Sequence, residues 1–426
     1  QVRSWRSLAA RVLLTATGRA GTHGGPVHLN LQFDGPLTPD AEDGWSAPRG
    51  GRARDRAWTV TEELDVRAPA FLAGDERTVV VAGDDAGPPA RVLAEIGGWP
   101  LLAEPTSGSR TGANAIRTYR LLLEDGALAD RIERVVVCGH PTLSRSVTRL
   151  LSRADVEVVA VRGPAHRRRP WTDPGHAVGR VVELDPTAAP RDGGARAERP
   201  APSPWLREWL DRDAETATRL DDLLARRTGL TPHEVAGAVA RALPARGLLF
   251  VGASNPVRDL DLMVPRYEVG ARRHVVANRG LSGIDGTVSS AIGAALGRPR
   301  SSRAFALMGD VTFLHDLTGL VIGPDEPRPD LTIVVVNDDG GSLFALLEQG
   351  APEHADSFER LFGTPHGADL GALCQGTGTA YTRVTDVVAL EAALARPPHG
   401  IEVVEAVVRR NDRRALDRDV RALVGG

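Results

Sequence analysis

Short apolar runs alternate with amphipathic stretches along most of the chain. The runs in RTVVVAG, RIERVVVCG and VEVVAVRG are rich in β-branched residues, as buried strands are, and helical patterns such as PPARVLAEIGG and SRSVTRLLSRA lie between them. The pattern predicts strands near Val80, Leu101, Val136 and Val159. Strands that alternate with helices in this way are typical of a doubly wound parallel sheet.

A second alternating unit follows after residue 204. It begins with helical patterns over 205–226 and 232–242, and its apolar runs are GLLFVGAS, RHVVAN, RAFALMGD, LTIVVVND and GIEVVEAVV. RAFALM and LTIVVV are almost continuously apolar, as expected of strands that are covered on both faces. The predicted fold class is therefore α/β, with two doubly wound parallel-sheet domains.

Composition suggests where these domains begin and end. Stretches rich in Gly, Pro and Arg indicate linkers, and the helical pattern WRSLAARVLLTATG with the strand-like GGPVHLNLQF is too short to form a domain. The predicted divisions are a domain remnant at 1–40, a linker at 41–65, a central α/β domain at 66–186, a linker at 187–204 and a C-terminal α/β domain at 205–426.

The charge balance argues against some classes of partner. The 52 basic residues are all arginine and are matched by 55 acidic residues, so the net charge of −3 gives no overall attraction to nucleic acid or to an anionic membrane. No apolar run approaches the roughly 18 residues that a membrane-spanning helix needs. Cys138 and Cys374 lie too far apart in sequence to indicate a metal cluster or a disulfide framework, and they favour a reducing cytoplasm.

Acidic, glycine-containing turns follow two predicted strands of the second unit. Gly309-Asp310 follows RAFALM, and NDDGG at 337–341 follows LTIVVV, so that Asp310 and Asp338 are 28 residues apart (338 − 310). Ligands of open α/β sheets bind at the carboxyl ends of the strands, and helices predicted just after both turns would offer free N–H groups to an anion. Mg²⁺ together with a diphosphate would suit this combination, although such turns are also typical of solvated loops.

The order of strand, Gly-Asp, helix, strand and NDDGG resembles the thiamine-diphosphate motif of the decarboxylase and synthase superfamily. The resemblance implies thiamine diphosphate with Mg²⁺ or Mn²⁺, the metal being held by Asp310, Asp338 and the carbonyl of Gly340. Gly309 and Gly341 would adjoin the cofactor. Asp338 stands where the superfamily more often has Asn, which adds a negative charge.

Longer motifs narrow the resemblance. ANRGLSGIDGTVSSAIGAALG, GASNPVRDLDL, NDDGGSLFALLEQG and LFGTPH look like those of the menaquinone-pathway 2-succinyl-5-enolpyruvyl-6-hydroxy-3-cyclohexene-1-carboxylate synthases. The resemblance runs from about Gly24 to the C-terminus and is strongest between Gly252 and His366. It implies a cytoplasmic, homodimeric or homotetrameric transferase that decarboxylates 2-oxoglutarate on thiamine diphosphate and adds the succinyl unit to isochorismate.

The resemblance also assigns individual contacts. Both substrates are dicarboxylates, which fixed bidentate arginines can orient. Ile284, next to Gly283, corresponds to the apolar residue that bends the cofactor. The implied substrate-binding residues are Ser254, Arg258, Arg279, Arg145, Leu343, Phe344 and Leu347. Exposed structural arginines, a turn hydroxyl and ordinary core packing are the alternative interpretations of these side chains.

No catalytic residue is identified. In the superfamily, a glutamate on an N-terminal pyrimidine-binding domain of the neighbouring subunit activates the cofactor, and residues 1–40 resemble only the last helix and strand of that domain. We therefore expect the glutamate upstream of Gln1 and a truncated chain. A chain complete as printed would bind the cofactor weakly, with little turnover. We interpret His315, the HRRRP run and both cysteines as structural or surface residues.

Two other functions remain open. Another thiamine-diphosphate carboligase or decarboxylase of 2-oxoacids, related to the acetohydroxyacid synthases, would not need both Arg258 and Arg279. A non-catalytic fragment that only binds the cofactor diphosphate would fit the expected absence of the glutamate.

Overall fold

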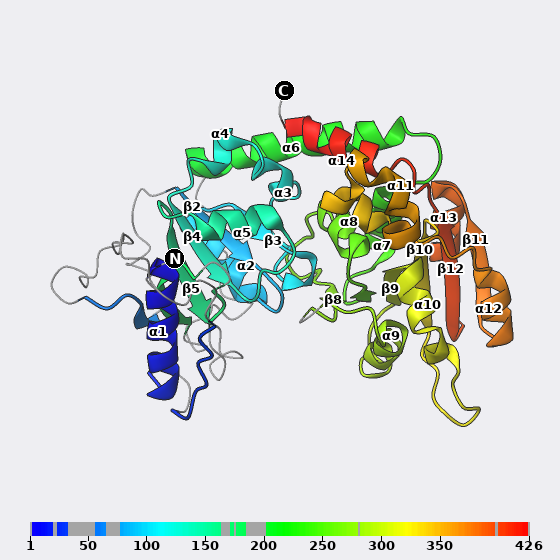
Figure 1. Cartoon of the computed structure of the whole chain (residues 1–426), viewed down its shortest axis with the longest axis horizontal. Helices are drawn as coiled ribbons and strands as arrows, with labels where there is room; N and C mark the ends of the chain where they lie inside the picture. Colours follow the sequence, from blue (N-terminus) through cyan, green and yellow to red (C-terminus); the bar gives the residue numbers. More distant parts are fainter. Residues whose placement is uncertain are drawn as a thin grey trace.

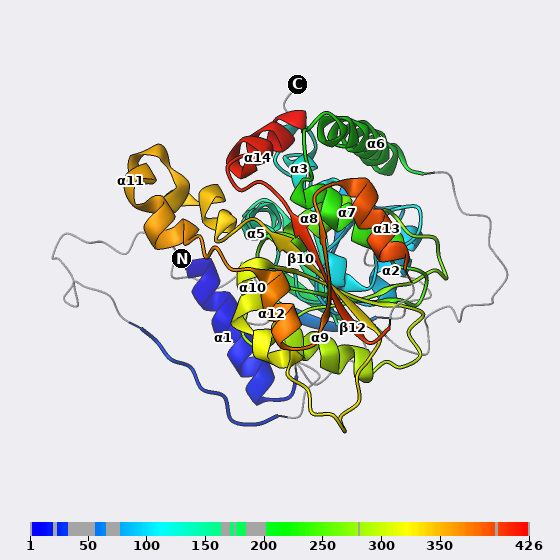
Figure 2. The same cartoon turned by 90° about the vertical axis from the view of Figure 1, so that its right-hand side faces the viewer.

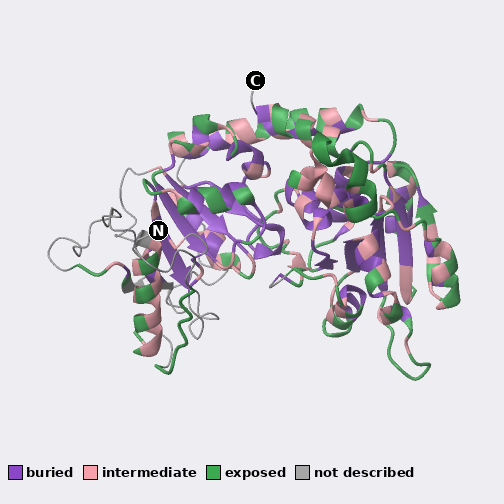
Figure 3. Cartoon of the chain, in the orientation of Figure 1, coloured by how far each residue is buried: buried purple, intermediate pink, exposed green. Residues whose placement is uncertain are grey.

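Two α/β units lie side by side, and helix α6 (Pro204–Ala225) crosses one end of both (Figure 1). The computed structural model describes residues 2–19, 24–32, 56–64, 77–162, 171–173, 176–184, 202–279, 282–396 and 399–424. The inner strands of both units are largely buried, whereas α6 is exposed along one face and the segment around α11 (Ala355–Phe358) is largely exposed (Figure 3). Most of the two predicted linkers lies outside the described residues.

The central unit is a six-stranded parallel sheet in the order β1-β6-β5-β4-β2-β3. Helix α2 covers one face of the sheet and α3 and α5 cover the other, so the predicted doubly wound arrangement is confirmed. The elements are β1 (Val60–Leu64), β2 (Thr78–Ala82), α2 (Pro88–Gly97), β3 (Leu101–Ala103), α3 (Tyr119–Leu122), α4 (Gly126–Ala129), β4 (Arg134–Cys138), α5 (Arg145–Ser152), β5 (Glu157–Arg162) and β6 (Val178–Leu184). The assignment of residues 60–64 to a linker is wrong, because they form the edge strand β1 and pair with β6.

The C-terminal unit is a second six-stranded parallel sheet, in the order β11-β12-β10-β9-β7-β8. Helices α7, α8 and α13 pack on one face, and α9, α10 and α12 pack on the other (Figure 2). The elements are α6 (Pro204–Ala225), α7 (Pro232–Ala242), β7 (Leu248–Val251), α8 (Asn255–Met263), β8 (His274–Val276), α9 (Thr287–Leu296), β9 (Ala304–Gly309), α10 (Asp310–His315), β10 (Leu331–Asn337), α11 (Ala355–Phe358), α12 (Leu370–Gly376), β11 (Ala380–Val384), α13 (Val387–Ala395), β12 (Ile401–Val407) and α14 (Arg413–Arg421). The sequence did not predict β11, a short edge strand that is largely solvent-accessible.

Helix α1 (Val2–Ala16) forms where the sequence predicts a helix. It packs on the central unit, where the Ser7 hydroxyl donates a hydrogen bond to Asp173 at 3.0 Å and the Arg11 guanidinium lies over the Trp171 ring. The predicted strand over residues 24–33 is wrong for its described part, because residues 24–32 pair with no strand that the structure describes and are exposed. An apolar pattern alone does not make a strand, because the backbone N–H and C=O groups also need a neighbouring strand to pair with.

Buried polar contacts fix the two units against each other. Arg110 of the central unit donates hydrogen bonds to the carboxylate of Asp261 on α8 at 3.0 Å and to its carbonyl at 2.6 Å, and the Tyr119 hydroxyl reaches the same carboxylate at 3.0 Å. Asp261 is fully buried. Since a buried carboxylate is tolerated only with such partners, this contact defines one relative position of the two units.

Glu104, just after β3, organises the same interface. One of its carboxylate oxygens accepts hydrogen bonds from the backbone N–H groups of Thr142 and Leu143, both at 2.9 Å. Thr142 in turn accepts from Arg279 of the C-terminal unit, whose Nε lies 3.1 Å from its hydroxyl. Burial is the main reason that the pKa of Glu104 is raised to about 8.

The stability of the Glu104→Gln variant should fall less than that of the parent protein as the pH rises from about 4.5 to about 8. Because the pKa of Glu104 is higher in the folded chain than in the unfolded chain, its stabilising contribution is fully present below about pH 4.5 and is lost as the pH rises through about 8. Over this range the free energy of unfolding of the parent should fall by up to about 1.4 kcal/mol per pH unit relative to the variant.

Urea denaturation at a series of pH values across this range measures the difference. Glu353→Gln, at an exposed glutamate, is the matched control. A difference between parent and Glu104→Gln that does not change with pH would contradict the prediction.

Candidate functional site

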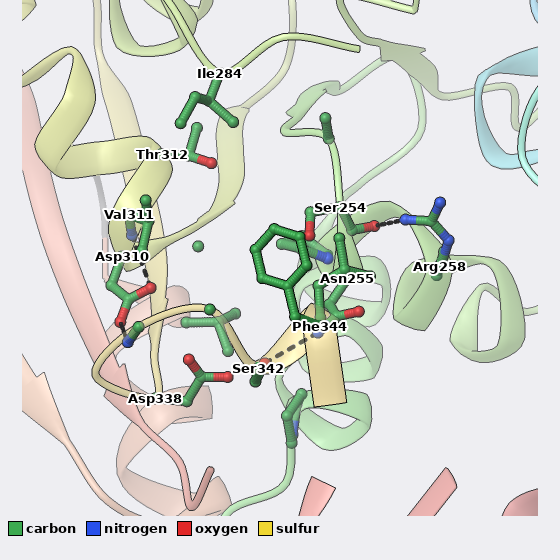
Figure 4. A pocket seen from close by; sticks show the side chains of 18 of the residues that line it. Ser254, Asn255, Arg258, Ile284, Asp310, Val311, Thr312, Asp338, Ser342 and Phe344 are labelled. Carbon is green, nitrogen blue, oxygen red and sulfur yellow. Dashed lines mark hydrogen bonds between the residues drawn. The ribbon is translucent and has the colours of Figure 1, made fainter. Parts of the chain in front are cut away.

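Two neighbouring strands bring the acidic turns together. β9 and β10 are parallel and paired, with Val336 opposite Gly309, so both strands end at the same edge of the sheet. Asp310 and Asp338 follow these strand ends and lie on the same side of a cavity, as predicted (Figure 4). The parallel pairing of β9 and β10 therefore brings the two acidic turns, which are distant in sequence, together in one site.

Backbone and side-chain donors hold Asp310 in place. One carboxylate oxygen accepts the N–H of Val311 at 2.7 Å, and the other accepts the N–H of Gly340 at 2.9 Å. The second oxygen also lies 3.1 Å from Nε2 of His366. Asp310 is 2% exposed, and these donors provide its ionised form with partners in place of water.

Asp338 is a partly buried carboxylate close to a second carboxylate. Its pKa is raised to about 7, first by burial and then by the negative charge of Asp310, although a hydrogen bond from Ser342 partly opposes the shift. Ser342 accepts a hydrogen bond from the Asn255 amide at 3.0 Å. A divalent cation between the two carboxylates would relieve their repulsion, so the residues present fit the implied metal.

The two carboxylates do not form a complete metal cage. Within the described ranges, no group of three or more His, Cys, Asp or Glu side chains is placed to hold a metal ion. The other ligands would have to be backbone carbonyls, such as that of Gly340, and oxygens of a bound diphosphate. Mg²⁺ is usually bound in this way, through one or two carboxylates and substrate phosphates.

The NDDGG turn requires its glycines. Gly340 has a φ of 135°, and a Cβ at this position would lie 2.1 Å from the carbonyl oxygen of Gly363. A Cβ on Gly341 would lie 2.3 Å from the carbonyl oxygen of Phe362. Both glycines thus let the turn approach the 359–368 segment closely.

The predicted helix after Gly341 is wrong. Residues Ser342–Leu346 form a short 3₁₀ helix, η6, and Leu347 then adopts an extended conformation that ends it. Helix α10 begins at Asp310 as predicted but has only six residues. The anion site expected at two helix N-termini is therefore limited to short helical turns.

Most predicted contact residues line the cavity. Figure 4 shows Arg258 on the side opposite the two carboxylates, with Phe344 between them. The predicted residues that line the cavity are Ser254, Arg258, Ile284, Gly309, Asp310, Asp338, Gly340, Gly341, Leu343 and Phe344. Gly283, Arg145, Arg279 and Leu347 do not line it.

The predicted arginines gather near the cavity. Arg258 donates a hydrogen bond to the Ser254 carbonyl at 2.7 Å, whereas Arg279 is buried against Thr142. Arg145 is exposed and pairs with Glu348 at 3.2 Å. Burial, followed by the positive charges of Arg120 and Arg279, lowers the pKa of Arg258. A cationic cluster with this mutual repulsion is suited to a ligand with more than one carboxylate.

Ser254 has an unfavourable backbone conformation. Its φ is 72° and its ψ is −137°, values that residues other than glycine rarely adopt. Ser254 is the N-cap of α8 and lies beside Asn255, whose amide oxygen is buried and has no hydrogen-bond partner among the described residues. Such strain concentrates at ligand sites.

Sequence reasoning missed several residues of the site. His366 lies in the LFGTPH motif and Asn255 in the GASNPVRDLDL motif, but the sequence predicts a role for neither residue. Arg120 and Arg413 come from other parts of the chain, and the buried Arg413 contacts Asp259 through two hydrogen bonds of 2.9 and 2.6 Å. Only the two motifs provided a signal that could have identified such residues.

Of the residues interpreted as structural or surface, His315, Cys138 and Cys374 are described, and none of these three lines the cavity. His315 is half-exposed and lies 3.2 Å from Asp285. Both cysteines are buried free thiols, as predicted for small apolar residues. The HRRRP run lies outside the described residues.

A family model and several relatives place the chain among the thiamine-diphosphate-dependent enzymes. The family model described as "Thiamine pyrophosphate enzyme, C-terminal TPP binding domain" matches residues 261–404, which implies thiamine diphosphate and a divalent metal ion as cofactors. Benzoylformate decarboxylase from Polynucleobacter necessarius shares the fold, with a TM-score of 0.51 and 17% identity over 80% of this chain and 63% of that chain, less than two thirds of its length.

Closer relatives define the family. The chain is 62% identical over 400 residues to the 2-succinyl-5-enolpyruvyl-6-hydroxy-3-cyclohexene-1-carboxylate synthase of Nocardioides sp., covering 94% of this chain and 72% of the relative. It is 42% identical over 427 residues to the synthase of Saccharopolyspora erythraea, covering 99% of this chain and 73% of that one. The chain therefore belongs to the family of 2-succinyl-5-enolpyruvyl-6-hydroxy-3-cyclohexene-1-carboxylate synthases.

None of the helices in the part of the chain that the structure describes is long and apolar enough to cross a membrane.

Replacing Asp310 with alanine should abolish metal-dependent binding of thiamine diphosphate, because Asp338 alone would then have to hold the cation. Calorimetric titration of thiamine diphosphate with and without Mg²⁺ measures the effect. Asp325→Ala, at an exposed aspartate, is the control and should bind normally. An unchanged affinity in Asp310→Ala would place the metal elsewhere.

Proposed function

We propose that this chain forms the metal-diphosphate and substrate-binding part of an active site that decarboxylates 2-oxoglutarate and adds the succinyl unit to isochorismate. The observation that carries the proposal is one cavity with two carboxylates on one side, Asp310 buried and Asp338 partly buried, and Arg258 on the other. Asp310, Asp338 and the carbonyl of Gly340 would hold the metal, and Gly309 and Gly341 would adjoin the cofactor. Thiamine diphosphate, when bound, supplies the electron sink for the loss of carbon dioxide.

The arginines would recognise the substrates. 2-Oxoglutarate and isochorismate each carry two carboxylates, and Arg258, Arg279 and Arg145 are the candidate cations. Arg258 is closest to this role, since it lines the cavity, whereas Arg279 would have to exchange a contact with Thr142 for a carboxylate. Arg120 adds positive charge beside Arg258, because its guanidinium donates to the Arg258 carbonyl at 3.1 Å.

Apolar side chains would shape and dry the reaction space. Leu343 and Phe344 line the cavity on the side of η6, and Ile284 lines it near Thr312 of α10. Excluding water strengthens the attraction between the arginines and the substrate carboxylates. Ile284, supported by Gly283, would press on the cofactor, whereas Leu347 would support this wall from behind.

For the whole protein we propose a homodimer or homotetramer in the cytoplasm. Support comes from the superfamily pattern, in which a neighbouring subunit provides the activating glutamate. The two free, buried thiols also agree with a reducing compartment.

The activity can be tested on the full-length protein. With thiamine diphosphate, Mg²⁺, 2-oxoglutarate and isochorismate, we expect the absorbance of isochorismate to fall in a reaction that requires all four components. No loss of isochorismate, together with rapid carboligation of pyruvate, would instead favour a different 2-oxoacid carboligase.

Arg258→Met should reduce kcat/KM for the dicarboxylate substrates by about 10- to 100-fold, because it removes a charge-assisted contact but retains much of the side-chain volume. The affinity for thiamine diphosphate should not change. Arg300→Met, at an exposed arginine, is the matched control. An equal loss of cofactor affinity would mean that Arg258 supports the fold of the site and does not contact substrate.

A further inference from the structure

His366 connects a third segment of the chain to the two acidic turns. Its Nε2 lies 3.1 Å from the Asp310 carboxylate, and the backbone N–H of Ala368 donates to its Nδ1 at 3.0 Å. Since Nδ1 accepts a hydrogen bond, the proton of the neutral ring is on Nε2. The imidazole therefore donates a hydrogen bond to Asp310.

The turn that carries His366 is itself fixed to the NDDGG turn. One carboxylate oxygen of Asp339 accepts the backbone N–H groups of His366 at 3.1 Å and Gly367 at 2.8 Å. The N–H of Gly341 donates to the Gly363 carbonyl at 2.7 Å. The histidine thus has a fixed position from which it reaches across to the end of β9.

We propose that His366 is a positioning residue for the metal site, and that its Nε2–H orients the Asp310 carboxylate toward the cation. A carboxylate has about four acceptor positions. Three are used by the N–H groups of Val311, Gly340 and His366, and two of these three are on the same oxygen. The remaining capacity lies on the oxygen that accepts only from Val311, so the histidine determines which oxygen faces the metal.

This inference rests on the proposed metal site. The competing role of the His366–Asp310 contact is purely structural, namely to hold the turn around His366 against β9. Two substitutions separate these roles. The side-chain amide of His366→Gln reaches about as far as Nε2 and can donate to Asp310. The shorter amide of His366→Asn reaches only the position of Nδ1, so it can keep the Ala368 contact but not the contact with Asp310.

The test is a titration of the full-length protein with Mn²⁺ at saturating thiamine diphosphate, with free Mn²⁺ measured by electron paramagnetic resonance. We expect His366→Asn to weaken Mn²⁺ binding by about 10-fold or more, as loss of such supporting contacts typically does, and His366→Gln to restore most of it. His354→Asn, at an exposed histidine, should bind as the parent does.

Each other outcome has a distinct meaning. Equal losses in His366→Asn and His366→Gln, or no loss in either, would overturn the positioning role while leaving the proposed function intact. Unchanged Mn²⁺ binding in Asp310→Ala would overturn the metal site itself and this inference with it. The thermal unfolding midpoints of both histidine variants should equal that of the parent, so that a change in Mn²⁺ affinity reports on the site. If His366→Asn does not fold, the Mn²⁺ affinity of His366→Gln is compared with that of the parent.

Discussion

The repulsion between two neighbouring carboxylates, one buried and one partly buried, is the constraint on which the site depends. Asp310 and Asp338 are brought together because β9 and β10 are adjacent and parallel, and burial makes the ionised form of either one costly. The protein compensates Asp310 with directed N–H groups, whereas Asp338 keeps a raised pKa of about 7. Asp310 therefore has N–H donors that offset its charge, whereas the charge of Asp338 is offset less. A divalent cation between the two carboxylates would neutralise the remaining negative charge.

The central unit contributes to the site through its interface with the C-terminal unit. The buried contact of Arg110 with Asp261 places α8, the helix that begins beside Ser254 and carries Arg258. On the same interface, Glu104 holds the Thr142 turn against Arg279. The cationic side of the cavity is therefore determined by contacts between the units, and the acidic side by strand order within one sheet.

Local patterns predicted the parts of the fold that local physics determines. The apolar runs of β9 and β10 could only be buried strands, and α7 begins at Pro232 because Thr231 and Glu234 form a capping box that the sequence itself contains. Elements that depend on distant partners were not predictable in this way. β1 and β11 are edge strands that exist through their pairing with β6 and β12, and residues 24–32 have an apolar pattern without a described strand to pair with.

The same distinction applies to the site. Asp310 and Asp338 could be predicted because each follows its own strand, and a parallel sheet places such positions at one edge. His366 has no comparable local signal. It reaches Asp310 only because the 359–368 segment packs closely against the NDDGG turn, and a Cβ on either glycine of that turn would clash with this segment. A sequence motif can therefore identify groups at the ends of regular elements, such as Asp310 and Asp338. A group that orients them, such as His366, is brought to the site by backbone contacts that exist only in the folded chain.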